Sequence, residues 1–254
     1  MVFADTHTHL YLEEFDADRD EVIDQCRQNG VQHLFCPNID LQSIDAMREM
    51  CSRYPDCHPM MGLHPSEVKA DYLRTTARIL EEAEQGDYVG IGEIGMDLYW
   101  DRTFEEEQKK VLYEQLCFAQ QKDLPAIIHC RKAFAETWSV LRQVKGPLKG
   151  IFHCFAGDVA QAHKIIERGF LIGVGGTVTY KRSGIQEVVR AIDLPYIVLE
   201  TDSPFLPPVP HRGERNASYH IPIIAQQIAD LKNVTLEEVA EQTTQNALKL
   251  FRCQ

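Results

Sequence analysis

The sequence predicts an α/β fold, a closed (β/α)8 TIM barrel with one extra helix at its C-terminal end. Short apolar segments recur along the chain at intervals of about 22 to 36 residues, and a stretch with helical character follows most of them. No linker or compositional break divides the chain, so we expect a single domain over residues 1–254. A doubly wound open sheet is the alternative, because alternation of strands and helices alone does not separate the two folds.

Each expected strand is short, largely apolar and ends in glycine, proline, asparagine or a polar residue. In chain order, the strands are expected at residues 1–9, 31–38, 58–65, 88–95, 124–130, 149–157, 170–177 and 196–204. Largely apolar strands of this kind are typical of a parallel barrel that helices cover. Helices are expected between them, for example at 18–30 and 104–123. The surplus segment 235–251 begins with Thr235 and Glu238 at capping-box spacing, which predicts the added helix.

Composition limits the classes of function. The chain is 44% hydrophobic and 25% charged, as ordinary globular domains are. It has no basic region followed by an apolar run at its start and no apolar stretch of about 18 residues, so we expect neither a standard secretion signal nor a membrane span. Eight scattered cysteines without a CxxC pair predict reduced thiols and a cytoplasmic location. The net charge of −12 disfavours a broad nucleic-acid surface, although bound cations can reverse the charge locally.

Histidines and carboxylates collect at the expected C-terminal ends of the strands, where TIM barrels carry their chemistry. They are His7, His9, His64, Glu93, His129, His153 and Asp202. Taken singly, each has an ordinary explanation, such as an exposed edge strand or a hydrogen-bonded core histidine. Even without His64, four imidazoles and two carboxylates are together too many ligands for one tetrahedral zinc ion with an open position. The set suits two divalent ions that share a carboxylate.

Two further carboxylates are expected behind the ligands. Residues two apart in a strand face the same way, so Asp5 shares a face with His7 and His9, and Glu200 shares one with Asp202. Buried charges are usually paired or bound to metal, and such residues often orient a neighbouring ligand. We therefore expect Asp5 and Glu200 to support the metal ligands.

The remaining histidines are expected to serve the fold. His33 and His58 lie at the beginnings of strands and His163 lies on a helix. His211 and His220 follow the last strand, and we expect them at the surface although they lie within reach of the site.

Motifs spread over nearly the whole chain resemble those of the TatD family of metal-dependent hydrolases and DNases, which are amidohydrolase-like TIM barrels. They are HTH at 7–9, GLHP at 62–65, GEIG at 92–95, IHCRKA at 128–133, HCF at 153–155 and ETDSP at 200–204. Any one of these motifs is weak, but they occur in the order of the family and are specific as a set.

The resemblance implies a centre with two divalent metal cations, for which zinc, manganese and magnesium remain open. It carries His7 and His9 over as ligands of one metal and Glu93 as the carboxylate that both metals share. His129 and His153 would hold the second metal.

The resemblance also implies roles in catalysis and substrate binding. Asp202 would bind the first metal and orient or deprotonate the attacking water, and His64 would lie near the substrate phosphate. Arg131 either faces the substrate or forms a salt bridge on the outer rim, and Arg212 and Arg215 are expected to contact phosphate.

The chain departs from the family pattern at three places. Tyr11 stands where the family usually has aspartate or asparagine, and Ala135 stands where it usually has an acid. Ala217 and Ser218 replace a glutamate–proline pair. The expected metal ligands are untouched, so we expect these changes to bear on substrate recognition around the mouth of the barrel.

The predicted function is hydrolysis of a phosphodiester, with DNA as the expected substrate. Because so acidic a chain attracts nucleic acid little at long range, we expect ends or single strands to be preferred. One alternative is an amidohydrolase-type enzyme that cuts an amide, ester or lactone in a small molecule; such enzymes often carry a modified lysine at the place of Glu93. A metal-binding or scaffold protein is a third interpretation. No pattern indicates an oligomeric state.

Overall fold

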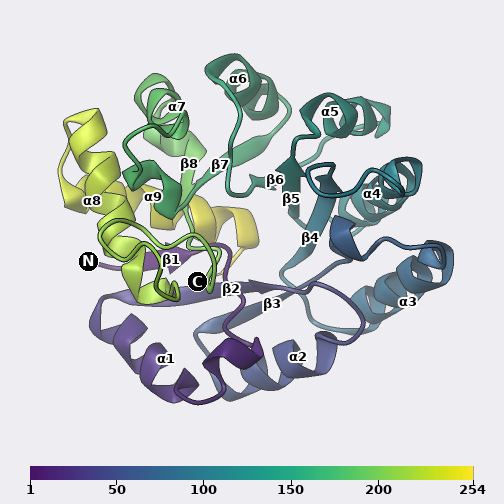
Figure 1. The fold of residues 1–254 in the computed structure, drawn as a ribbon, viewed down its shortest axis with the longest axis horizontal. Coiled ribbons are helices and arrows are strands. Elements are labelled where there is room, and N and C mark those ends of the chain that lie inside the picture. The colour runs from purple at the N-terminus through teal and green to yellow at the C-terminus, as the bar shows by residue number, and fades with distance from the viewer. Residues whose placement is uncertain (254) are drawn as a thin grey trace.

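The computed structural model describes residues 1–253 and confirms the predicted TIM barrel (Figure 1). Each strand pairs in parallel with the next one along the chain, from β1 to β8. The strands are β1 (Phe3–Asp5), β2 (Val31–Pro37), β3 (Cys57–Met61), β4 (Gly90–Asp97), β5 (Ala126–Arg131), β6 (Gly150–Phe152), β7 (Phe170–Val174) and β8 (Ile197–Leu199).

Helices surround the strands, as Figure 1 shows. They are α1 (Arg19–Gln28), α2 (Ile44–Arg53), α3 (Tyr72–Gln85), α4 (Glu105–Gln121), α5 (Phe134–Gln143), α6 (Val159–Glu167), α7 (Ile185–Ala191), α8 (Ile221–Lys232) and the added α9 (Leu236–Phe251). Short 3-10 turns are η1 (Glu13–Phe15), η2 (Pro65–Glu67), η3 (Gly176–Thr179), η4 (Leu194–Tyr196) and η5 (Ser218–His220). Thr235 and Glu238 form the predicted capping box of α9. Over residues 1–253, none of the helices combines the length and apolar character that crossing a membrane requires.

The ring closes between β8 and β1 just beyond the residues that form these two strands. The backbone nitrogen of Thr6 donates to the carbonyl oxygen of Leu199 at 2.9 Å, and that of Asp202 donates to His7 at 2.9 Å. The backbone nitrogen of His9 donates to Ser203 at 2.8 Å. Closure of the barrel therefore places the two histidines from the start of the chain beside Asp202, which follows the last strand.

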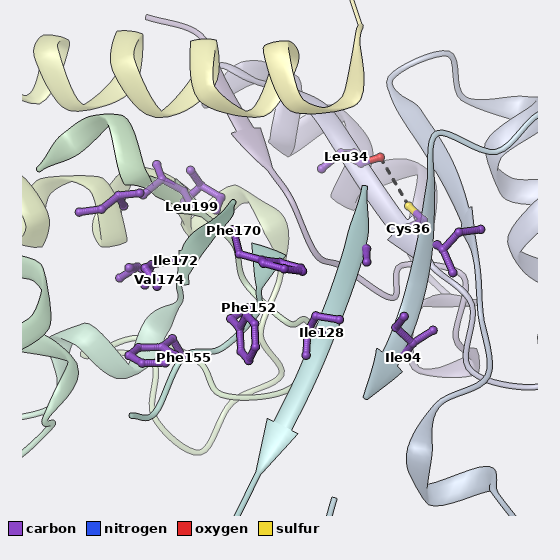
Figure 2. Close-up of a cluster of buried hydrophobic side chains, with 14 of the residues drawn as sticks. Leu34, Cys36, Ile94, Ile128, Phe152, Phe155, Phe170, Ile172, Val174 and Leu199 are labelled. Carbon is purple, nitrogen blue, oxygen red and sulfur yellow. Dashed lines mark hydrogen bonds between the residues drawn. The ribbon is translucent and has the colours of Figure 1, made fainter. Parts of the chain in front are cut away.

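Alternation along the strands separates two buried clusters. Figure 2 shows part of the larger cluster, which lies between the strands and the surrounding helices. Its labelled strand residues are Leu34, Cys36, Ile94, Ile128, Phe152, Phe170, Ile172, Val174 and Leu199. Their neighbours along the strands face the barrel axis and form the smaller cluster, with Ala4, Phe35, Met60, Ile127, Ile151 and Val198.

Helix α9 covers the end of the barrel at which the strands begin. The side-chain amide of Asn246 donates to the carbonyl oxygen of Ile197, the first residue of β8, at 2.8 Å. The ring of Phe251 stacks on Phe35 with centroids 3.9 Å apart, so it completes the inner cluster. The added helix thus closes the barrel at the end opposite the predicted site.

Most of the observed strands end several residues earlier than the sequence predicted. We expected the first strand to include His7 and His9, but β1 ends at Asp5, and β8 ends three residues before Asp202. These residues instead lie on the loops that leave the sheet. The observed strands are shorter because the backbone turns after Asp5 and after Leu199, where the ring closes. Beyond these points the side chains no longer alternate between the two faces of a strand.

Replacement of Phe251 by alanine is expected to destabilise the fold by about 3–5 kcal/mol, since it removes a buried aromatic ring and leaves a cavity. Denaturant unfolding of Phe251→Ala measures this loss. Leu73→Ala on α3 is the matched control, because Leu73 is 64% exposed whereas Phe251 is 5% exposed. Equal stability of the two variants would show that α9 does not complete the barrel core.

Candidate metal centre

Glu93 lies inside β4, where the strand carries one extra residue relative to its neighbour. Ile91 pairs with Ala126 and Ile94 pairs with Ile128, so the ladder is irregular across Glu93. A side chain at Gly92 would meet the Cβ atom of Ile127 at 2.6 Å, so only glycine fits beside the irregularity. The backbone nitrogen of Glu93 donates to the carbonyl oxygen of Asn38 at 3.0 Å. These contacts fix a buried carboxylate at the mouth of the barrel.

One oxygen of Glu93 faces the two histidines that follow β1. Its Oε2 atom lies 3.1 Å from Nε2 of His7 and 3.4 Å from Nε2 of His9. The two Nε2 atoms are themselves 3.2 Å apart. Asp202 completes this group, because its Oδ1 atom lies 3.7 Å from both nitrogens.

The other oxygen of Glu93 faces three histidines, one in β5 and one in each of the loops that follow β3 and β6. Its Oε1 atom lies 2.7 Å from Nδ1 of His129, 2.8 Å from Nε2 of His153 and 3.3 Å from Nε2 of His64. We expected His64 near the substrate phosphate. In the structure its ring also lies against the Glu93 carboxylate. Glu93 lies between two separate sets of donors, with one oxygen toward each.

The donor set fits divalent cations. Ligand atoms of His7, His9 and Glu93, and separately those of His64, Glu93 and His129, lie within 4.8 Å of one another. Burial and the charge of His153 keep the pKa of His7 well below its usual value, which favours a neutral ring. A neutral imidazole has one nitrogen lone pair, and the ring nitrogens and carboxylate oxygens that converge here offer ligand atoms to a cation once the rings are neutral. A cation satisfies such a set, because metals bind neutral histidine and ionised carboxylate.

Electrostatics keep Glu93 ionised. Burial by itself raises the pKa of a carboxyl group, but the surrounding histidines, with His153 first and His129 through a hydrogen bond, outweigh it and hold the pKa of Glu93 well below its usual value. Its side chain is only 4% exposed. Asp202 differs, because burial and the nearby charge of Glu93 raise its pKa, and its side chain is 16% exposed. Asp202 is thus the carboxylate of the centre that reaches the open side.

Asp97 belongs to the same cluster, and the sequence analysis missed it. Its Oδ2 atom lies 3.1 Å from Nε2 of His129, on the side of the ring away from Glu93. Burial lowers the pKa of a histidine, but the hydrogen bonds with Asp97 and Glu93 raise the pKa of His129 to about 9. Alternation in β4 from Glu93 through Gly95 to Asp97 was the available signal.

Asp5 and Glu200 lie behind the ligands. Asp5 accepts hydrogen bonds from the backbone nitrogens of His7 at 3.2 Å and Thr201 at 2.9 Å, so it ties the two ligand-bearing loops together. The Oε2 atom of Glu200 lies 3.8 Å from Nδ1 of His153. A side chain at Gly173 would meet this oxygen at 2.9 Å, so the glycine makes room for it.

Comparison with known proteins identifies the family. A family model described as TatD related DNase matches residues 4–252. The chain belongs to the TatD family. Membership in this family of metal-dependent hydrolases agrees with a donor set built for cations.

Individual relatives match along their whole length. The chain is 36% identical to the uncharacterized metal-dependent hydrolase YabD of Bacillus subtilis, with 99% of each protein covered. It is 31% identical to the 3'-5' ssDNA/RNA exonuclease TatD of Erwinia tasmaniensis, with 97% of this chain and 98% of the relative covered. The crystal structure of YjjV, a TatD homologue from Escherichia coli K12, matches with a TM-score of 0.91 at 29% identity, over 99% of this chain and 98% of that one.

Tyr11, where the TatD pattern usually has aspartate or asparagine, lies directly behind His9. Its hydroxyl donates its single proton to the carbonyl oxygen of Pro37 at 2.7 Å. The same oxygen lies 2.9 Å from Nδ1 of His9, toward which it can then only accept. Nδ1 therefore carries a hydrogen, which leaves Nε2 as the nitrogen on the side of Glu93. In the neutral ring, the tyrosine thus favours the tautomer that would offer Nε2 to a metal.

A second departure from the TatD pattern also lies behind the ligands. Ala217 and Ser218 are buried, and the Ser218 hydroxyl donates to that of Thr8 at 3.0 Å, between the two histidines of the first motif. We expected Tyr11 and this pair to bear on substrate recognition at the mouth. Their places in the structure correct that expectation, because they contact the ligand-bearing loop from inside the protein.

The three expected arginines have different surroundings. Arg215 pairs with Asp18 through both guanidinium nitrogens, at 2.9 and 2.6 Å, so its donors are committed within the protein. Arg131 and Arg212 are exposed and lie over tyrosine rings at the mouth, so the expected salt bridge on the outer rim is not what holds Arg131.

His220 was expected at the surface, but it is only 5% exposed. Its Nδ1 atom lies 2.9 Å from the side-chain oxygen of Asn216 and its ring stacks on His211. The segment after β8 folds back over its own start, which buries a histidine that the sequence placed in an open loop.

Tyr11→Phe is expected to weaken metal binding about 10- to 100-fold, the usual effect of removing a partner that orients a ligand. Metal titration against a chromophoric chelator measures the change. Tyr113→Phe on α4 is the matched control, because that ring is 40% exposed and lies away from the mouth. Metal affinity equal to that of the unmodified protein would show that the hydroxyl does not position His9.

Proposed function

We propose that this TatD-family protein is a two-metal phosphodiesterase that acts on DNA, with ends or single strands as its preferred substrate. One observation carries the proposal: the two oxygens of Glu93 face separate donor sets, with His7 and His9 on one side and His129 and His153 on the other. A carboxylate shared in this way suits two ions, which together clamp the attacking and leaving oxygens of a displacement.

The residues of the centre have distinct proposed roles. His7, His9 and Asp202 would hold one ion, His129 and His153 the other, and Glu93 both. When bound, such ions lower the pKa of water and stabilise charge on phosphate oxygens. Asp202 is the proposed general base, because its carboxylate is the more exposed of the two and faces the histidine pair. Asp97, Glu200 and Tyr11 would hold the imidazoles in place.

The ligand types favour zinc over magnesium. The proposed set has more imidazoles than carboxylates, and imidazole suits zinc and other transition metals, whereas magnesium prefers oxygen. The described cysteines are all free, which supports the cytoplasm as the compartment.

The name of the Erwinia relative supports a nucleic-acid substrate, since that protein is described as an exonuclease on single-stranded DNA and RNA. The alternative is a small-molecule hydrolase of the amidohydrolase type. Those enzymes often carry a modified lysine at the place of Glu93, and the glutamate therefore disfavours this alternative. The cleavage assay below distinguishes the two functions.

Glu93→Gln is expected to lower kcat/KM on a labelled single-stranded oligonucleotide by at least about a hundredfold, equivalent to about 2.7 kcal/mol of transition-state stabilisation. The amide cannot serve both ions as a charged bridge, so the metal content should fall from about two ions per chain toward one. Elemental analysis of the purified protein and a cleavage assay with added Mn²⁺ measure the two effects.

Glu136→Gln is the control, because its carboxylate lies at the start of α5 with Arg102 as its nearest cation, at 3.9 Å. It should leave metal content and cleavage unchanged. A p-nitrophenyl ester panel runs in parallel. Cleavage of esters but not of DNA, lost in Glu93→Gln, would favour the amidohydrolase alternative, and fewer than about one ion per chain at saturation would contradict the two-metal centre.

A further inference from the structure

Two cavities open on either side of the loop that follows β6, residues 153–157. The larger, here called the Tyr180 cavity, has a volume of about 530 Å³ and is lined in part by Cys154, Tyr180, Lys181, Arg182 and Arg212. The smaller, the Tyr99 cavity, has a volume of about 390 Å³ and is lined in part by Tyr99, Arg131, Lys132, Phe134 and His153. Both volumes fall in the range of small-ligand sites.

Both cavities adjoin the metal centre. The Tyr99 cavity is lined by His153 itself, and the Tyr180 cavity is lined by the next residue, Cys154. Phe155 and Ala156 line both, so a narrow ridge separates the two. A chain molecule that passes over this ridge therefore enters both cavities beside the centre.

Each cavity contains an arginine stacked on a tyrosine. The guanidinium carbon of Arg131 lies 4.1 Å from the ring centroid of Tyr99, and that of Arg212 lies 4.6 Å from the ring centroid of Tyr180. Stacking holds the plane of a guanidinium and leaves its edge free to donate hydrogen bonds. Among residues 1–253, neither arginine forms an ion pair with an acidic side chain, in contrast to Arg215.

Charge is distributed unevenly around the mouth. In a chain with a net charge of −12, the described linings of the two cavities hold no carboxylate and five cations. These cations are Arg131, Lys132, Lys181, Arg182 and Arg212. The five cations of these two linings therefore favour the binding of a polyanion there.

Exposed aromatic rings lie beside the smaller cavity. Trp100 is 79% exposed and Tyr99 is 48% exposed, and their centroids are 4.6 Å apart. Exposed rings next to unpaired cations are the combination by which proteins hold single-stranded nucleic acid, with bases on the rings and phosphates on the cations.

We propose that the two cavities are nucleotide subsites for a single strand of DNA, next to the metal centre on the side of β5, β6 and β7. This inference rests on the proposed phosphodiesterase function. The neighbouring phosphates bind Arg131 and Arg212, and an unstacked base lies on the Tyr99–Trp100 pair. A duplex fits poorly, because its bases are paired and stacked and cannot reach the rings.

The test compares two substrates, a labelled single-stranded oligonucleotide and bis(p-nitrophenyl) phosphate, which has no flanking nucleotides. Arg131→Gln and Arg212→Gln should each lower kcat/KM on the oligonucleotide at least about tenfold more than on the small phosphodiester. The plot of log KM against log salt concentration should become shallower by about 0.7 for each lost phosphate contact.

Three further variants separate charge from stacking. Arg212→Lys should leave the salt dependence of KM unchanged because lysine keeps the positive charge. Its affinity for the oligonucleotide should fall, because lysine cannot stack on the Tyr180 ring as the guanidinium does. Trp100→Ala should lower kcat/KM on the oligonucleotide by about fivefold or more without changing the salt dependence. Arg142→Gln is the control, because Arg142 is an exposed cation in the last turn of α5, away from both cavities.

The outcomes distinguish the two proposals. Cleavage of neither substrate by the unmodified protein would overturn the phosphodiesterase function itself. If both substrates are cleaved but the Arg131 and Arg212 variants lower both rates equally, the subsites are wrong while the phosphodiesterase stands. Cleavage of a blunt duplex as fast as the single strand would overturn the single-strand assignment.

Discussion

The burial of one carboxylate, that of Glu93, is the constraint on which the rest of the site depends. An ionised carboxylate inside a protein is stable only when opposite or hydrogen-bonding groups surround it. Here histidines from both ends of the barrel sheet surround it, and His7 and His9 reach it only because β1 and β8 close the ring. Helix α9 covers the opposite end, so the polar cluster lies at one mouth of an otherwise apolar barrel.

A consequence of this arrangement is that two of the three departures from the TatD pattern, at Tyr11 and at Ala217 with Ser218, lie behind the proposed ligands, whereas Ala135 is exposed on α5. Tyr11 supplies a hydroxyl whose proton is already committed to Pro37, so the group can only accept from His9. A carboxylate also accepts from an imidazole, and the two residue types therefore serve the same tautomer. The exposed residues around the mouth include the linings of both cavities and the two arginines that lie over tyrosine rings.

The sequence predicted the barrel and the residues that meet at its mouth, because both follow from the spacing of apolar segments and the placement of polar residues after them. It did not predict that Arg215 pairs with Asp18, since residues so distant along the chain meet only through the fold. The irregularity at Glu93 was hidden for the same reason, as it depends on the register against β5. Asp97 could have been predicted, because it lies four residues after Glu93 in the same strand and alternation places both side chains on one face.

The central claim is that Glu93 lies between two ions, each held by its own histidines. Anomalous diffraction from crystals grown with Mn²⁺ tests it most directly. The account predicts two peaks on opposite sides of Glu93, one contacting His7, His9 and Asp202 and the other contacting His129 and His153. A single peak at saturating Mn²⁺, or peaks that Glu93 does not join, would contradict it.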